Sequence, residues 1–296
     1  MADNKYFPFS FNQQKVLAYA PKPASFMSIA CSIFLIQRIL RDPLRRGKVY
    51  HRMILVLSVH TSILCFALFL GTWPMPKDSL SAVYGAIGTE RTCTAQGFVI
   101  LFETSTVPSY YLSLSLFSFL AIRYDFNEEI LRKYEPWLHT TIHIVPLTLS
   151  IIAIENKFLN PAISNCYATP YPFGCRRNDD IPCIHGHLYS LWRKFAWAVL
   201  TYLSLNFISA AVLLVILYFS VRQKEKENER LDGIQQFREN ARKSKSRLIA
   251  TQASLYFGAF ICTYAFPMLS RSVHLFSGRV NVRLYMIAPI MISLQG

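Results

Sequence analysis

The feature that most constrains this chain is a long apolar run, residues 53–75, that contains no Asp, Glu, Lys or Arg. A helix needs about 20 predominantly apolar residues to cross the roughly 30 Å hydrocarbon layer of a membrane, and this run meets that length. The run is apolar on every side rather than along one stripe, which is typical of a helix surrounded by lipid or by other helices. The chain is therefore predicted to be an integral membrane protein.

Further runs of the same kind predict that the chain crosses the membrane repeatedly. Hydrophobic residues make up 52% of the 296 residues and charged residues only 16%, whereas about a quarter of a globular domain is charged. We expect an all-α, seven-transmembrane, receptor-like helical bundle that forms a single domain. The expected spans are residues 19–40, 52–74, 92–122, 136–154, 195–221, 248–270 and 284–296.

The seventh run is short, because the sequence ends at Gly296. A helix over residues 284–296 would extend only about 20 Å at 1.5 Å per residue. Its terminal carbonyls would lack partners if they ended in hydrocarbon. We expect the sequence to be truncated within the seventh helix, and the alternative is a re-entrant or interfacial segment.

The distribution of Lys and Arg predicts the orientation of the bundle. With an extracellular N-terminus, the cytoplasmic links carry more than half of the 31 Lys and Arg residues, in agreement with the positive-inside rule. These basic residues would lie beside the membrane surfaces, so we expect contact with membrane lipid and no nucleic-acid partner. The expected location is the plasma membrane. Residues 155–194 then form the second extracellular loop.

Residues 222–247 are the one strongly polar segment, and they form the predicted third cytoplasmic loop. The segment mixes charges of both signs with few apolar residues. One interpretation is a solvated helical extension of the two flanking spans, supported by acid–base pairs along its face. The other is a docking surface for a cytoplasmic partner. Composition favours neither over the other.

Four of the seven cysteines fall on the side that this orientation makes extracellular, and none falls in a cytoplasmic link. The four are Cys93, Cys166, Cys175 and Cys183. An even number of cysteines on one face favours disulfides in an oxidising compartment, and four cysteines allow three pairings.

Several short motifs follow one another in order along the chain. They are Arg41-Asp42-Pro43-Leu44-Arg45-Arg46, Ala121-Ile122-Arg123-Tyr124, Glu135-Pro136-Trp137-Leu138-His139, Asn165-Cys166-Tyr167-Ala168 and Thr263-Tyr264-Ala265-Phe266-Pro267. Together they resemble the G-protein-coupled receptor-like proteins of unicellular eukaryotes, a group similar to the slime-mould cyclic AMP receptors. The resemblance implies an extracellular ligand and a heterotrimeric G protein as partners.

The resemblance also implies roles for individual residues. It pairs Cys93 with Cys166, which leaves Cys175 with Cys183 as a local bridge. It implies that a G protein contacts the cytoplasmic ends of spans three, five and six. The residues concerned are Arg123, Tyr124, Arg222, Lys245 and Arg247. One position departs from the pattern, because Ile122 stands where rhodopsin-like receptors have an acid before the arginine.

Glu103 is the only acid inside an apolar run. A carboxylate in a membrane is costly, so it should face the bundle interior with a partner. We predict that Glu103, Thr106, Ser109 and Tyr110 bind the ligand. The alternatives are a structural pair or a protonated acid for Glu103, and helix packing for the hydroxyls.

Two prolines are expected to kink helices, Pro146 in span four and Pro267 in span six. His139 and His143 are four residues apart and share one helix face, but no further metal ligands are visible nearby. We therefore expect these histidines to pack rather than to bind a metal.

Enzyme chemistry finds little support in the sequence. There is no glycine-rich phosphate loop and no pair of carboxylates within a span, so we expect neither an enzyme nor a cofactor. Two alternatives to a receptor are a small-solute transporter or channel and a truncated, non-signalling seven-helix membrane protein. A transporter should show internal repeats and a continuous polar path, and neither is evident.

Overall fold

The computed structural model describes residues 9–77, 83–123, 128–172, 175, 183–185, 189–228, 233–277 and 281–296. Within these ranges, the side chains of residues 122–123, 128, 130–131, 189, 224–228, 233–250 and 253 lie outside the described part. The elements are α1 (Phe11–Tyr19), α2 (Pro21–Arg41), α3 (Pro43–Arg46), α4 (Val49–Leu70), α5 (Glu90–Arg123), α6 (Glu128–Glu155), β1 (Leu159–Pro161), β2 (Cys166–Ala168), α7 (Tyr189–Asn228), α8 (Gly233–Ser277) and α9 (Val282–Ser293).

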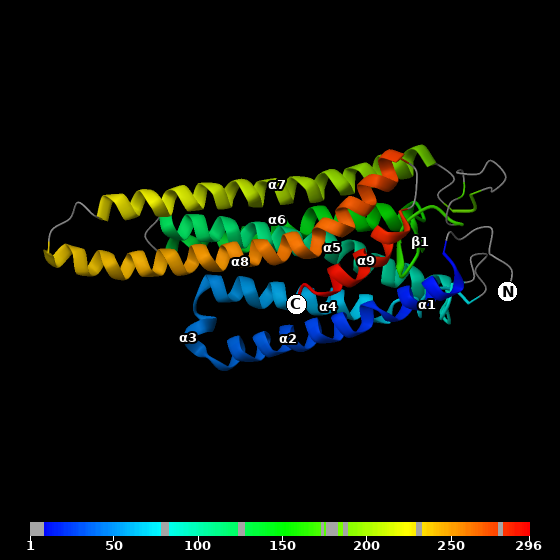
Figure 1. Cartoon of the computed structure of the whole chain (residues 1–296), viewed down its shortest axis with the longest axis horizontal. Helices are drawn as coiled ribbons and strands as arrows, with labels where there is room; N and C mark the ends of the chain where they lie inside the picture. The colour runs from blue at the N-terminus through cyan, green and yellow to red at the C-terminus, as the bar shows by residue number, and fades with distance from the viewer. Residues whose placement is uncertain are drawn as a thin grey trace.

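The chain folds as an elongated bundle of helices, as the apolar runs predict (Figure 1). Four helical stretches among the described residues are long and apolar enough to cross a membrane. They are Phe11–Arg41, Val49–Leu70, Arg132–Glu155 and Ser190–Gln223. These stretches identify an integral membrane protein, and spans beyond these four remain a prediction.

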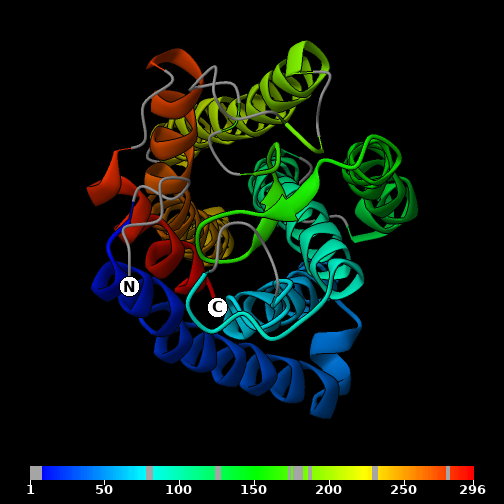
Figure 2. The same ribbon diagram turned by 90° about the vertical axis from the view of Figure 1, so that its right-hand side faces the viewer.

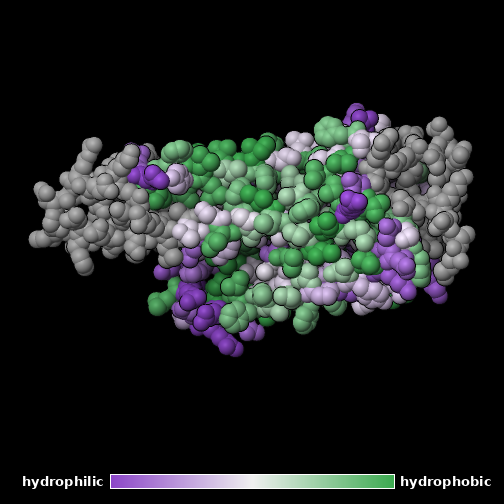
Figure 3. Space-filling model, viewed as in Figure 1, coloured by the Kyte–Doolittle hydropathy of each residue, from purple (hydrophilic) through white to green (hydrophobic). Residues whose placement is uncertain are grey.

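The outer surface of the bundle is more apolar than much of its interior. In α2 the buried side chains include Ser25, Ser28 and Ser32, while Phe26 and Phe34 are exposed. Small residues between membrane helices let the backbones approach closely, and large apolar residues face the lipid. Figure 3 shows apolar residues along the middle of the molecule and hydrophilic residues gathered toward its ends.

Short polar signals set several helix ends. Ser10 and Gln13 form a capping box at the start of α1, and Asn281 accepts a hydrogen bond from the backbone N–H of Leu284 at the start of α9. Asp42 caps α3 in the tight link between α2 and α4. Helix α4 ends at Gly71, whose φ of 57° favours glycine over residues with a Cβ.

The two ends of the bundle differ in the links that they carry. The hairpin of β1 and β2 lies at the same end as the first described residues (Figure 1). Helix α3 lies toward the opposite end, where the last part of α7 and the first part of α8 extend beyond it (Figure 1). Figure 2 looks along the bundle from the hairpin end, where the hairpin crosses over the helices. The structure thus separates the cysteine-containing loop from the basic links.

Helix α5 is the centre of the packing. It contacts α4, α6, α7, α8 and both strands. Helix α9 packs against α8 and α2, and the chain after it turns into the bundle. Ser28 donates to the Ser293 carbonyl at 2.6 Å, and Tyr111 donates to the Gln295 carbonyl at 3.2 Å. Carbonyls that we expected to lack partners in this segment are therefore satisfied.

Several element bounds differ from the predicted ones. The first apolar stretch begins earlier, at Phe11, and is divided at Ala20 by the start of α2. Residues 222–247 are largely helical, because α7 continues to Asn228 and α8 starts at Gly233. This agrees with the interpretation of the polar segment as helical extensions. The predicted loop 155–194 contains a hairpin and the first residues of α7.

Candidate functional site

A disulfide fixes the hairpin to the first turns of α5. Cys93 of α5 bonds Cys166 of β2, and the pair lies in a core cluster where both side chains are buried. Cys175 bonds Cys183 further along the same loop. Both pairings are those that the resemblance implied. The first bridge holds the loop against the end of the helical bundle.

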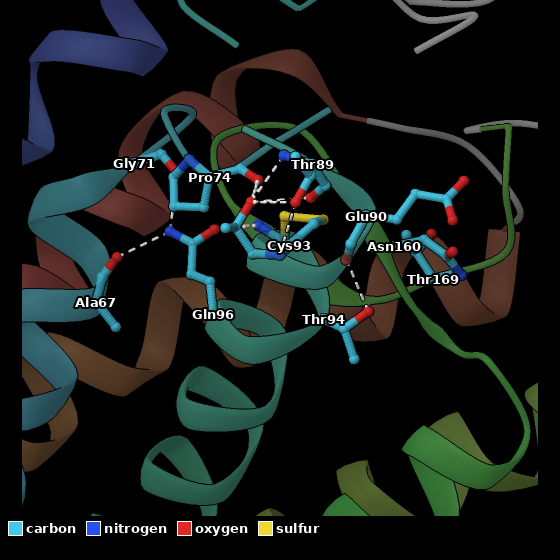
Figure 4. The surroundings of a disulfide bond; sticks show 12 residues. Ala67, Gly71, Pro74, Thr89, Glu90, Cys93, Thr94, Gln96, Asn160 and Thr169 are labelled. Atoms are coloured by element: carbon cyan, nitrogen blue, oxygen red, sulfur yellow. Dashed lines mark hydrogen bonds between the residues drawn. A yellow bond between two sulfur atoms is a disulfide. The ribbon is translucent and has the colours of Figure 1, made fainter. Parts of the chain in front are cut away.

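Gln96 reinforces this attachment from one turn further along α5. Its amide nitrogen donates to the carbonyls of Ala67 and Gly71, at 2.9 and 2.8 Å. Its amide oxygen accepts from the backbone N–H of Cys166 at 3.0 Å. Figure 4 shows Gln96 beside the disulfide, reaching toward the end of α4. One buried side chain therefore joins α4, α5 and the hairpin.

The end of β2 is also tied to α7 and α8. The Ala168 carbonyl accepts from Arg271 Nη2 at 2.6 Å and from Trp192 Nε1 at 3.4 Å. The Arg271 guanidinium lies over the Tyr167 ring, 5.0 Å from its centroid. A cation over an aromatic face is attracted by the negative face of the ring. The hairpin thus forms a roof that is held by three long helices.

Beneath this roof lies a cavity of about 170 Å³. It is bounded by the hairpin loop and by helices α4, α5, α7, α8 and α9. Its walls are mostly apolar, and a few polar groups converge on it, which is the usual composition of a small-molecule site. The lining residues from the helices include Leu68, Ile100, Thr104, Leu200, Tyr264, Met268, Arg271, His274 and Ile292.

Tyr264 is the most informative residue of this cavity. Its side chain is 1% exposed, and its hydroxyl has no hydrogen-bond partner among the described residues. A buried hydroxyl without a partner costs free energy. Arg271 adds a positive charge to the wall, and the described part of the chain places no acid within ion-pair distance of it. The cavity wall therefore carries a cation among mostly apolar residues, and the Tyr264 hydroxyl is buried within that wall.

The four residues predicted to bind a ligand do not line this cavity. Thr106 donates to the Phe102 carbonyl, and Ser109 contacts the Tyr202 hydroxyl at 2.7 Å. Glu103 and Tyr110 face α4 and α6 instead, where Glu103 contacts His60 and Tyr110 contacts His139, each at 2.8 Å. Their role in ligand binding stays a prediction, and the contacts that they make in the fold join neighbouring helices or turns.

The predicted coupling residues lie at the other end of the bundle. Arg123 is the last residue of α5, and Lys245 and Arg247 belong to α8, but their side chains lie outside the described part. Tyr124 also lies outside the described residues. Arg222 of α7 is exposed, with its guanidinium 5.2 Å from the centroid of the Tyr218 ring.

Both predicted kink positions lie inside continuous helices. Helix α6 continues through Pro146 and α8 through Pro267, and Figure 1 shows the final part of α8 turning away from the line of its first part. Pro108 also lies inside a helix, α5, and was not among the predicted kink positions. Pro267 itself lines the cavity, so the bend of α8 contributes to the cavity shape.

Sequence reasoning missed the polar groups that depend on contacts between helices. His60 interrupts the charge-free run in α4, and an intramembrane histidine could have been paired with Glu103 on that ground. Arg52 of α4 and Glu135 of α6 form a bidentate ion pair. Arg52 Nε lies 2.7 Å from Glu135 Oε1, and Arg52 Nη2 lies 2.5 Å from Glu135 Oε2. No feature of either local sequence identifies that partner.

Comparisons with known proteins add no assignment. No protein-family model matches the chain, and no curated protein is significantly similar to it.

Proposed function

We propose that this chain is a seven-span membrane receptor with its N-terminus outside the plasma membrane. In this proposal it binds an extracellular ligand and activates a heterotrimeric G protein. The observation that carries the proposal is the cavity under the disulfide-tethered hairpin, with the buried Tyr264 hydroxyl and Arg271 in its wall. An anionic group of a ligand would pair with the Arg271 guanidinium, for which the described residues supply no acid.

Helix α8 supplies the physical connection between the two ends. It lines the cavity with Tyr264, Met268 and Arg271, and it continues to Gly233 at the opposite end of the bundle. A ligand shifts the receptor between two states only if it binds those states with different affinity. Contacts on α8 that change with its position relative to α5 and α7 would supply that difference.

Nucleotide exchange on a panel of purified G proteins tests this proposal, with membranes that contain the chain and a library of small extracellular ligands. Arg123→Ala should reduce exchange, because Arg123 ends α5 on the proposed cytoplasmic side. Arg193→Ala is the matched control: Arg193 is exposed near the start of α7, at the hairpin end, and its loss should leave exchange unchanged.

A second variant tests the cavity rather than the coupling surface. Met268→Trp adds bulk to the cavity wall and should abolish the response to a ligand while basal exchange persists. Exchange that is absent with every G protein and ligand contradicts the receptor proposal. Solute uptake that Met268→Trp blocks and Arg123→Ala leaves intact would favour the transporter instead.

A further inference from the structure

A series of polar groups at hydrogen-bond distance from one another lies between α4, α5 and α6, away from the cavity. His60 Nδ1 lies 2.8 Å from the Glu103 carboxylate, and His60 Nε2 lies 3.0 Å from His143 Nε2. His143 Nδ1 in turn lies 2.6 Å from the backbone carbonyl of His139. The side chain of Glu103 is 4% exposed and that of His60 is 13% exposed. These contacts are at hydrogen-bond distances between side chains that are largely shielded by the surrounding helices.

The number of hydrogens in this series of hydrogen bonds follows from its two ends, the Glu103 carboxylate and the His139 carbonyl. The His139 carbonyl can only accept, so His143 Nδ1 carries a hydrogen. A bond between the two Nε2 atoms needs one hydrogen, and the bond between His60 and Glu103 needs another. An ionised Glu103 with two neutral histidines supplies one hydrogen on each ring. The three bonds therefore need one proton more than that state contains.

Without this extra proton, the three hydrogen bonds cannot all form. If both Nδ1 atoms carry hydrogens, the two Nε2 lone pairs face each other at 3.0 Å, and Glu103 keeps a negative charge without a cation beside it. With the extra proton, all three bonds form and the net charge of the group is zero. This holds whether the proton resides on Glu103 or on a histidine ring, because both arrangements contain the same number of hydrogens.

We infer that His60, His143 and Glu103 form a buried proton-binding site that joins α4, α5 and α6 in the folded protein. The site is independent of the receptor proposal, since it uses neither the cavity nor the cytoplasmic end. A shared proton also fits the geometry better than a metal ion. The nitrogen separation is that of an N–H···N hydrogen bond, and the described residues contain no cluster of three or more potential metal ligands.

Five other ionisable groups lie near the proposed site, on the three helices that form it and on α8. They are Tyr110 of α5, His139 and Glu135 of α6, Arg52 of α4 and Tyr264 of α8. The Tyr110 hydroxyl lies 2.8 Å from His139 Nδ1, and Glu135 is bonded to Arg52 and lies 3.9 Å from His139 Nε2. Tyr202 of α7 contacts Ser109. The pairs Tyr110–His139 and Arg52–Glu135 are complete without an additional proton.

The test compares thermal unfolding midpoints in detergent from about pH 6 to about pH 9, because histidine in an unfolded chain titrates near pH 6.5. A folded state that binds more protons than the unfolded state loses stability as pH rises. Relative to Glu103→Gln, the wild-type midpoint should therefore fall with rising pH, by roughly 2–4 °C. In Glu103→Gln an amide N–H replaces the missing hydrogen, so all three bonds form with neutral histidines.

Two further variants make the comparison specific. His143→Gln can donate to His60 Nε2 while His60 donates to Glu103, so the hydrogen bonds no longer need the extra proton and the pH-dependent difference should become smaller. It provides the answer if Glu103→Gln does not fold. Asp42→Asn is the matched control, because the Asp42 carboxylate is paired with Arg45, which stays charged throughout this pH range. Its midpoint should be displaced from wild type by the same amount throughout this pH range.

A wild-type midpoint that runs parallel to those of Glu103→Gln and His143→Gln at every pH would overturn the proton site. A metal ion between the Nε2 atoms would overturn it differently. In that case, at fixed pH, added zinc would raise the wild-type midpoint, a chelator would lower it, and His143→Gln would respond to neither.

Discussion

The two sides of α5 handle buried polar groups in opposite ways. On the side of α4 and α6, Glu103 and Tyr110 contact histidines at hydrogen-bond distance. On the side of α7, α8 and α9, the wall that faces α5 across the cavity contains the Tyr264 hydroxyl, which has no partner in the described part of the chain. One side is a closed polar network, and the other is a cavity with an unsatisfied group.

This difference distinguishes buried polar groups that stabilise the fold from buried polar groups that lack a partner within it. A buried polar group that its own chain satisfies fixes the register of the helices around it. A buried polar group that lacks a partner costs stability until something else supplies one. Glu103 looks more functional in the sequence because it is charged, yet its partner lies in the neighbouring helix. Tyr264 draws less attention in the sequence, and its hydroxyl has no partner among the described residues.

The largest effect should come from the disulfide that forms the cavity roof. Cys93→Ser opens a link between positions separated by 73 residues, and a closed loop of that length contributes about 4 kcal/mol to the free energy of unfolding. Amide hydrogen exchange should increase around β2 and the hairpin end of α5. Exchange near His60 should change little, because its bonds to α5 and α6 do not involve the roof.

Cys175→Ser is the matched control for this prediction. It opens a bridge between positions separated by only 8 residues, for which the same relation gives about 2.5 kcal/mol. Equal losses from the two variants, measured as the free energy of unfolding in detergent, would contradict the dependence on loop length. An increase in exchange near His60 as large as that around β2 would break the proposed independence of the two sides of α5.

Much of the helical architecture could be predicted from the sequence, because a charge-free apolar run such as residues 53–75 has few alternatives in water. The candidate site was harder to predict. Tyr264 and Arg271 become cavity residues only when α8 packs beside the hairpin, and spacing along the chain does not encode that contact. The same limit explains why Glu103 was predicted to contact a ligand although His60 satisfies it in the fold.

The second-largest effect should come from the Arg52–Glu135 ion pair, toward the end of the bundle opposite the hairpin. Arg52→Leu leaves Glu135 partly buried without its cation, and breaking such a pair costs about 3 kcal/mol. We take the lower end of the usual range because the two side chains are 24% and 12% exposed. Arg52 also donates to the carbonyls of Arg46 and Gly47, so the link after α3 should loosen in the same variant.

Chemical unfolding of three variants distinguishes the ion pair from general damage. Adding Glu135→Gln to Arg52→Leu should recover part of the loss, because the uncompensated carboxylate is then gone. Arg45→Leu is the control, since its pair with Asp42 is exposed and should contribute less than about 1 kcal/mol. A double variant as unstable as the sum of its single variants would show that the two residues do not act as a pair.

The smallest effect gives the most specific test of the comparison. The same change, Tyr to Phe, should alter stability in opposite directions on the two sides of α5. Tyr110→Phe removes a bonded hydroxyl and leaves His139 Nδ1 without its partner, so it should lower the free energy of unfolding by about 1 kcal/mol. Tyr264→Phe removes an unpartnered buried hydroxyl and should raise it by a similar amount. Both are measured by chemical unfolding without ligand. A loss of stability from Tyr264→Phe as large as that from Tyr110→Phe would mean that the Tyr264 hydroxyl is satisfied in the folded protein. The contrast between the two sides of α5 would then fail.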